Sequence, residues 1–171
     1  MLEAAVRVIA QDGVRGLRVE KLAAEAGVST ALIYYHFKDR AGILRAALEH
    51  VNHRARLYTE PEEGDPRTQL EQMLLSELQD SPQVRETSVA WGELRASAVF
   101  HEELRELLCE ATRAWCDDVA ALVREVDPAL DAGAVAERLT ALVEGLSERW
   151  HSGSVSLERA RELLTGAVGD L

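Results

Sequence analysis

Four side chains close together in the sequence, Tyr34, Tyr35, His36 and Lys38, carry donor groups that suit a phosphate. Tyrosine hydroxyls, an imidazole N–H and a lysine ammonium can each donate a hydrogen bond to a phosphate oxygen. We expect Phe37, the remaining aromatic residue of this stretch, to pack in the core. Lys38 also stands where a further helix is predicted to begin, and the N-terminus of a helix favours a phosphate. The cluster therefore indicates contact with a nucleic-acid backbone.

Two short helices must position this cluster. The pattern predicts helices over residues 19–26 and 30–37, with a break at Gly27 and an N-cap at Ser29. Gly27 can adopt the positive φ that the turn needs, and the small side chain of Ala23 lets the two helices cross closely. Such a pair is a helix-turn-helix, whose second helix can enter the major groove of DNA. The first residues of that helix, which would face the base edges, are Thr30, Ala31 and Leu32.

The same helix pair also has a plain structural interpretation. Short helices joined by a glycine turn occur in all-helical proteins that never bind DNA. The net charge of −11 is a further objection to DNA binding. However, residues 1–60 carry a net charge of +2 and residues 61–171 carry −13. Because salt screens charges beyond about 8 Å, the local charge matters more than the total. The two halves are therefore expected to have different partners.

The rest of the chain predicts further helices and no strand. Apolar residues recur at helical spacing, with breaks rich in Gly, Pro and Asp between them. These helices are predicted over residues 2–11, 40–58, 67–79, 82–99, 102–126, 132–150 and 157–168. We therefore expect an all-α protein of about nine helices. Its N-terminal domain would cover residues 1–48, and a second helical domain would cover residues 49–171.

Several other protein classes are disfavoured. No apolar run approaches the roughly 20 residues that span a bilayer. The first residues form an amphipathic pattern rather than a signal peptide. Cys109 and Cys116 would lie about 10.5 Å apart along one helix, which is too far for a disulfide. We therefore expect a cytoplasmic protein that has no membrane partner.

An enzyme is the main alternative. His50 and His53 are three residues apart on a predicted helix, and residues 101–103 (His-Glu-Glu) could add metal ligands. However, the spacings of known metal motifs, paired carboxylates and glycine-rich phosphate loops are absent. We expect no catalytic residue, no metal and no cofactor, although a triad assembled in space would leave no sequence pattern. A dimeric structural adaptor is a third alternative, and DNA binding discriminates among the three.

Residues 2–51 resemble the N-terminal domain of TetR-type transcriptional regulators. The matching stretches are AAVRVIAQDGVRGLRVEKLAAEAGVS and, more distinctively, TALIYYHFKDRAGIL. The resemblance implies a three-helix DNA-binding domain, a helical domain for ligand binding and dimerisation, and repression relieved by a small-molecule effector. Carried over residue by residue, it makes seven positions DNA contacts: Arg18, Thr30, Ala31, Tyr34, Tyr35, His36 and Lys38.

The chain departs from the family pattern in two places. Near Arg18 the family often has a hydroxyl that contacts a phosphate, so Arg18 would make this contact through its guanidinium. Family members also often carry a basic arm before the first helix, so either this protein binds without an arm or its start is trimmed. We expect a homodimer on a partly palindromic double-stranded operator, with recognition helices about 34–36 Å apart or a multiple of that distance.

Residues 88–164 are similar to the C-terminal domain of the BetI-type branch, named for a choline-responsive repressor.

Tryptophan on an apolar helix face is usually plain core, and a lone cysteine is usually a small buried hydrophobe. Burial of Glu144 is costly unless it pairs, for example with Arg113 or Arg149. Alternatively, Glu144 and one or two tryptophans hold a cationic effector by charge and cation–π contact. Because one fold can sense unrelated molecules, the effector itself is not identified. The candidate effector-binding residues are Met73, Trp91, Leu94, Cys109, Trp115 and Glu144.

The last two predicted helices carry more apolar surface than a thin outer helix pair needs. We expect them to form a twofold four-helix interface, with some of the residues facing the core of their own protomer. The candidate interface residues are Val135, Leu139, Leu142, Leu146, Trp150, Leu157, Leu163 and Leu164.

Overall fold

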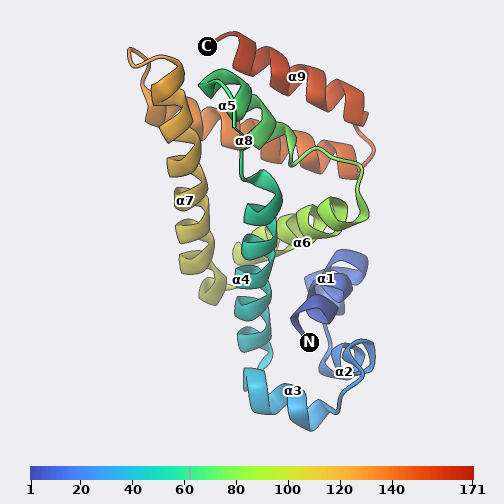
Figure 1. Ribbon diagram of the computed structural model, residues 1–171. Helices are drawn as coiled ribbons and strands as arrows, with labels where there is room; N and C mark the ends of the chain where they lie inside the picture. Colours follow the sequence, from blue (N-terminus) through green and yellow to red (C-terminus); the bar gives the residue numbers. More distant parts are fainter. Residues whose placement is uncertain (62) are drawn as a thin grey trace. The chain divides into compact units, whose positions relative to one another are not determined.

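The computed structural model describes residues 1–61 and 63–171. These residues form nine α-helices and no strand (Figure 1). The all-α prediction is therefore confirmed. No helix in these ranges combines the length and the apolar character that a membrane crossing requires. The helices are α1 (Leu2–Gly16), α2 (Val19–Ala26), α3 (Thr30–Phe37), α4 (Arg40–Thr59), α5 (Pro66–Leu75), α6 (Pro82–Ala98), α7 (Glu102–Val126), α8 (Ala132–His151) and α9 (Leu157–Gly169).

The chain forms two compact units. Unit 1 consists of residues 1–54 and 86–110, and unit 2 consists of residues 55–85 and 111–171. Helices α4, α6 and α7 contribute residues to both units. The predicted domain boundary between residues 48 and 49 falls inside α4 and stays a prediction.

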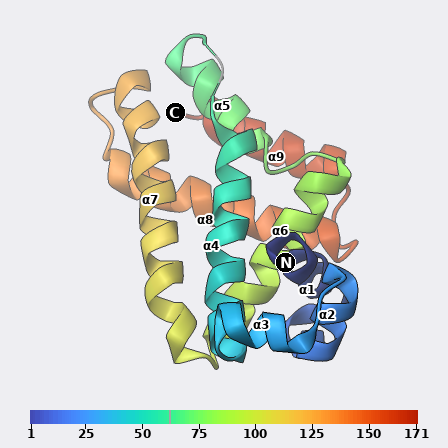
Figure 2. The same ribbon diagram turned by 60° about the horizontal axis from the view of Figure 1, so that its bottom comes forward.

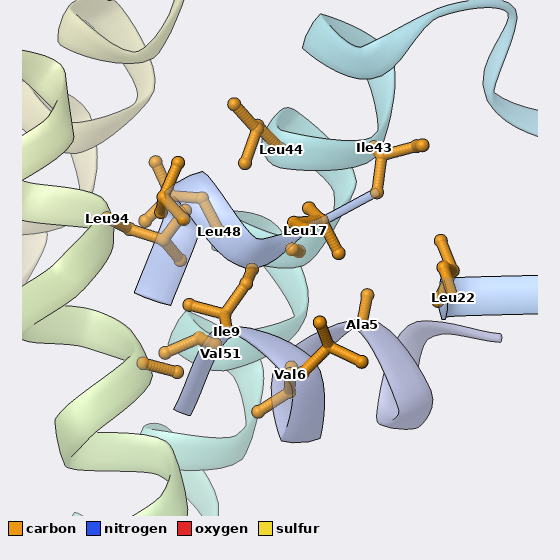
Figure 3. Close-up of a cluster of buried hydrophobic side chains, with 14 of the residues drawn as sticks. Ala5, Val6, Ile9, Leu17, Leu22, Ile43, Leu44, Leu48, Val51 and Leu94 are labelled. Carbon is orange, nitrogen blue, oxygen red and sulfur yellow. The ribbon is translucent and has the colours of Figure 1, made fainter. Parts of the chain in front are cut away.

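Unit 1 has its own apolar core. Residues of α1, α4 and α6 pack together at its centre, and Leu22 and Ile33 attach α2 and α3 to it. Figure 3 shows the middle of this cluster, where Ala5, Val6, Ile9, Leu17, Leu22, Ile43, Leu44, Leu48, Val51 and Leu94 are labelled. Leu22 and Ile33 are fully buried, so the helix-turn-helix is fixed to the unit from its inner side.

A buried arginine also joins helices of unit 1. Arg54, only 7% exposed, donates from Nη1 to Glu3 Oε2 (3.1 Å) in α1 and to Glu86 Oε1 (2.7 Å) in α6. His50 Nε2 lies 2.8 Å from Glu3 Oε1, and this hydrogen bond is the largest cause of the lowered pKa of Glu3. A guanidinium can be buried here because it is paired with carboxylates.

Unit 2 contains α5, α8, α9 and the C-terminal part of α7, seen from a second side in Figure 2. Its core is formed mainly by Leu, Val and Ala side chains from these four helices. Arg67 of α5 donates to the carbonyl of Val168 (2.8 Å), and Thr165 of α9 donates to Glu71 (2.6 Å). These hydrogen bonds align α5 with α9.

Two helix ends differ from the sequence prediction by more than one residue. α1 continues past residue 11 to Gly16, with an interruption at Gly13, where φ is 71°. α5 ends at Leu75 instead of residue 79. The three residues after it form a tighter turn, and Arg161 of α9 donates to the carbonyls of Leu75 (3.3 Å) and Leu78 (2.7 Å). Arg161 thus supplies the donor that carbonyls at a helix C-terminus need.

Candidate functional site

The outward surface of α3 carries the residues that the sequence assigned to DNA. Ile33 is the one buried residue of this helix. The side chains of Tyr34 and Tyr35 are 51% and 81% exposed. The other assigned residues of this region, Thr30, Ala31, His36 and Lys38, are exposed as well. α3 therefore presents a continuous polar and aromatic surface to solvent.

Capping interactions fix the two ends of α3. The Ser29 side chain accepts a hydrogen bond from the Leu32 N–H (3.2 Å), as the sequence predicts for an N-cap. Gly27, which ends α2, has φ 66°, in the left-handed region that the turn needs. Phe37 is half-buried and packs against the unit 1 core, also as expected.

The turn from α3 to α4 is tight. Lys38 has φ 64° and is the one non-glycine residue with positive φ in the described ranges. Its N–H donates to the Tyr34 carbonyl (2.9 Å), while the Asp39 carboxylate accepts from the Gly42 N–H (2.7 Å) and caps α4. A Cβ on Gly42 would lie 2.0 Å from the Phe37 carbonyl oxygen, so only glycine fits here. This backbone places Lys38 between the two helices with its side chain exposed.

Arg18 lies apart from this turn, at the N-cap of α2. Its side chain is exposed and makes no capping hydrogen bond to α2. Two exposed ion pairs, Arg7–Glu25 and Lys21–Asp12, connect α1 to α2. The guanidinium of Arg18 therefore faces solvent from a helix start that α1 fixes in position.

The candidate effector residues divide between the two units. In unit 1, Leu94 is fully buried in the core, and Cys109 is exposed rather than buried. Trp91 is half-buried, with the Arg95 guanidinium carbon 5.6 Å from the ring centre. In unit 2, Met73 is buried in the core, while Trp115 and Glu144 are half-buried. Their role in binding an effector stays a prediction.

A half-buried carboxylate in unit 2, that of Glu77, was not predicted as a site from the sequence. Glu77 follows the end of α5, and its Oε2 accepts a hydrogen bond from the Tyr58 hydroxyl at 3.2 Å. The pKa of Glu77 is raised to about 7, chiefly by burial; the Tyr58 hydrogen bond opposes this shift, and the negative charge of Glu144 adds to it. The signal in the sequence was an acidic residue between Leu74 and Leu78, both fully buried.

An open groove of about 640 Å³ lies beside Glu77. Tyr58 and the two neighbours of Glu77, Ser76 and Leu78, belong to its lining, which also includes the acidic side chains of Glu60 and Asp80. Tyr58 therefore both lines the groove and donates a hydrogen bond to the Glu77 carboxylate.

Two of the histidines considered as metal ligands each contact a single carboxylate. His50 pairs with Glu3, and His101 Nδ1 lies 3.3 Å from Glu103 Oε1. Within residues 1–61 and 63–171, no three His, Cys, Asp or Glu side chains come together as a metal site. Neither Cys109 nor Cys116 takes part in a disulfide within the described residues.

Most of the candidate interface residues pack inside unit 2. Five of them are buried, Leu142 and Leu157 are half-buried, and Leu163 is 39% exposed. The outer face of α8 instead exposes Ala141 and Gly145, and a Cβ on Gly145 would meet only open space. The five buried residues are Val135, Leu139, Leu146, Trp150 and Leu164.

The sequence matches two family descriptions. Residues 66–171 match "BetI-type transcriptional repressor, C-terminal", and residues 1–47 match "Bacterial regulatory proteins, tetR family". A curated relative, the HTH-type transcriptional regulator BetI of Rhizobium meliloti (strain 1021), is 27% identical over 163 residues, which cover 92% of this chain and 80% of the relative.

Solved structures agree with these matches. A putative TetR-family transcriptional regulator from Rhodococcus sp. is 48% identical with a TM-score of 0.90, covering 98% of this chain and 94% of that one. A putative transcriptional regulator from Saccharomonospora viridis, solved in complex with choline, is 25% identical with a TM-score of 0.85, covering 98% of this chain and 93% of that one. These relatives are named as regulators, so the chain is a regulator and not an enzyme. It belongs to the TetR family of ligand-responsive transcriptional regulators, with a C-terminal region of the BetI repressor type.

Proposed function

We propose that the protein is a homodimeric repressor that binds a palindromic DNA operator through α3 and leaves it when a small cation binds unit 2. The observation that carries this proposal is the surface of α3, where Ile33 alone is buried and the tyrosine, histidine and lysine donors face solvent. A core role for this cluster, the plain structural alternative, would require these side chains to be packed inside. A regulator of bacterial genes also works in the cytoplasm, where the chromosome lies.

The proposed reading surface combines two kinds of contact. Thr30 and Ala31 open α3, so they would lie at the base edges when the helix enters the major groove. Tyr34, Tyr35 and Lys38 would donate to phosphates and set the register of the protein on the duplex. Arg18 would hold a further phosphate at the start of α2.

The proposed dimer uses the outer face of α8 together with α9. The small residues Ala141 and Gly145 lie exposed on α8, and Leu163 and Gly166 lie exposed on α9. Small residues allow helices of two protomers to approach closely, while the half-buried Leu142 and the exposed Leu163 supply apolar surface. A twofold axis at this face would relate two copies of α3, one for each half-site of a palindromic operator.

The proposed effector is an organic cation. Glu77 is a largely desolvated carboxylate whose charged neighbour is a second carboxylate, Glu144. A cation that entered beside them would relieve the like-charge repulsion and compensate the cost of burial. Choline, which is bound in the Saccharomonospora viridis regulator, is a cation of this kind. The half-buried Trp115 of unit 2 is a candidate for cation–π contact.

Release of DNA would follow from a difference in affinity. A cation that binds one conformation better than another shifts the population toward that conformation. If the favoured conformation holds the α3 helices of the two protomers at a spacing that does not match the operator, the affinity for the operator falls.

Selection of bound DNA from a random duplex pool tests the operator. We expect enrichment of an inverted repeat, and electrophoretic mobility shifts with the enriched sequence should report one dimer per site. Tyr35→Ala should abolish the shift while dimerisation persists. Enrichment of no sequence, or an unchanged affinity of Tyr35→Ala, would contradict the assignment of α3.

Isothermal titration with choline chloride tests the effector class. We expect the wild type to bind and Glu77→Gln to bind at least tenfold more weakly, because the amide removes the negative charge. Glu137→Gln, an exposed carboxylate on α8, is the matched control and should bind as the wild type does. Absence of heat with choline and with other quaternary ammonium ions would exclude a cationic effector.

A further inference from the structure

The backbone N–H and carbonyl of Val14 are both held by side chains from other helices of unit 1. Its N–H donates to Oε2 of Glu93 in α6 at 3.0 Å. Its carbonyl accepts from Nη2 of Arg40, the first residue of α4, at 2.6 Å. Both hydrogen bonds are partly buried. One backbone position therefore connects α1, α4 and α6.

Gly13 makes this arrangement possible. Its φ of 71° and ψ of 173° interrupt α1 and leave the N–H groups of the following turn in need of acceptors. A Cβ at this position would lie 2.7 Å from Glu93 Oε2. Glycine thus permits both the backbone conformation and the close approach of the carboxylate. The Glu93 carboxylate then accepts at the restart of the helix, as a capping side chain does.

The Val14 backbone lies close to α2 along the chain, and α2 precedes α3, the helix proposed to enter the major groove. Only Leu17 and Arg18 separate α1 from α2, and Leu17 is 2% exposed. α1 contacts α2, and α2 contacts α3. A displacement of the Val14 backbone would therefore move α2 and α3 with it, because the segment that joins α1 to α2 is short and packed.

We propose that Glu93 is a positioning residue for DNA recognition: through its hydrogen bond to Val14, α6 sets the orientation of α2 and α3. The inference rests on the proposed dimeric, operator-binding function. In a dimer, an altered orientation of each reading helix changes the distance between the two helices. Glu93 should therefore determine which separation of half-sites the protein accepts.

The experiment compares full-length wild type, Glu93→Ala and Glu93→Gln on a series of duplexes. Each duplex carries the two selected half-sites with the spacer lengthened or shortened by single base pairs. Glu106→Ala removes an exposed carboxylate from α7 of the same unit and is the control. Circular dichroism gives the Tm of each variant, and amide hydrogen exchange follows the backbone around Val14.

We expect the wild type to show a sharp optimum of affinity at one spacer length. The affinity of Glu93→Ala should fall about tenfold at this spacer length and less at neighbouring lengths. The Val14 amide hydrogen should exchange faster in this variant. Glu93→Gln keeps an acceptor oxygen and should retain the optimum with a loss of less than about threefold. Glu106→Ala should match the wild type.

Two results would overturn the inference. One is an unchanged spacing profile for Glu93→Ala. The other is an equal loss at every spacer length together with a lower Tm, which would make Glu93 a residue of general stability. A wild type without any spacing optimum would instead contradict the proposed dimeric operator binding, and slower or unchanged Val14 exchange in Glu93→Ala would then independently reject the role of Glu93.

Discussion

The guanidinium carbon of Arg85 lies 4.9 Å from the centre of the Trp150 ring in unit 2. The ring of His151 stacks on the same tryptophan, with ring centres 4.5 Å apart and planes inclined by 31°. Both ring nitrogens of His151 are buried and find no hydrogen-bond partner in the described part of the chain. Burial, and secondly the positive charge of Arg85, lower the pKa of His151 to about 4.

This histidine should make the protein sensitive to acid. In the unfolded chain its pKa is near 6.5, so the unfolded state binds the proton more readily and folding stability falls as the pH drops from 6.5 toward 4. Between pH 7 and pH 4.5, we expect the Tm of His151→Gln to fall by less than the Tm of the wild type. His53→Gln, at an exposed position, should follow the wild type. Parallel Tm curves for wild type and His151→Gln would show that His151 does not titrate in this way.

Glu77 should have the opposite pH dependence. Its folded pKa of about 7 lies above the unfolded value near 4.5, so stability falls as the pH rises through this range. Since one pKa unit corresponds to about 1.4 kcal/mol, the buried charge destabilises the fold by on the order of 3 kcal/mol at pH 8. We expect Glu77→Gln to have a higher Tm than the wild type at pH 8 and a similar Tm at pH 5. A gain of equal size at both pH values would exclude ionisation of Glu77 as its cause.

Lys38 should contribute to the salt dependence of operator binding. Each neutralised phosphate adds about 0.9 to the slope of log affinity against log salt, and a dimer would contribute two lysines. Lys38→Asn is the suitable variant, because asparagine tolerates the positive φ at this position. Titrations at several salt concentrations should give a weaker affinity and a slope shallower by about 1.8. Lys21→Asn, which removes the lysine paired with Asp12, should leave the slope unchanged.

The proposed dimer face can be tested separately from DNA. Gly145→Arg places a long charged side chain in the open space on α8, so the isolated protomer should fold normally. We expect analytical ultracentrifugation to show a monomer, and the affinity for the full palindrome to fall to that for a single half-site. Glu137→Gln, on the same helix, should remain dimeric. A dimeric Gly145→Arg variant would place the interface elsewhere.

Much of the fold could be predicted from local sequence patterns. Helical spacing of apolar residues, Gly27 and Ser29 act within a few residues, and α2, α3 and α7 have the predicted bounds. The ends of α1 and α5 depend on distant residues. Glu93 contacts the backbone beside Gly13, and Arg161 satisfies the carbonyls after α5. Neither contact has a local signal.

The candidate sites show the same division. The donor groups of α3 and the family resemblance pointed to Thr30, Ala31, Tyr34, Tyr35, His36 and Lys38, and all six residues are exposed. Periodicity could not show which apolar residues of α8 and α9 pack in the core and which face a partner protomer, because both kinds of residue recur at the same helical spacing. Glu77 was missed because its pKa depends on burial in the fold, on the Tyr58 hydrogen bond and on the charge of Glu144, and both residues lie far away in the sequence.

The buried Arg54, shared between Glu3 and Glu86, constrains how the sequence can evolve. Both acids offset the charge of the buried guanidinium, so loss of one acid weakens this compensation, whereas joint replacement of all three residues by apolar ones can be neutral. Closely related repressors should therefore inherit these three positions as a set. Where one relative has exchanged the arginine, both acids should have changed with it.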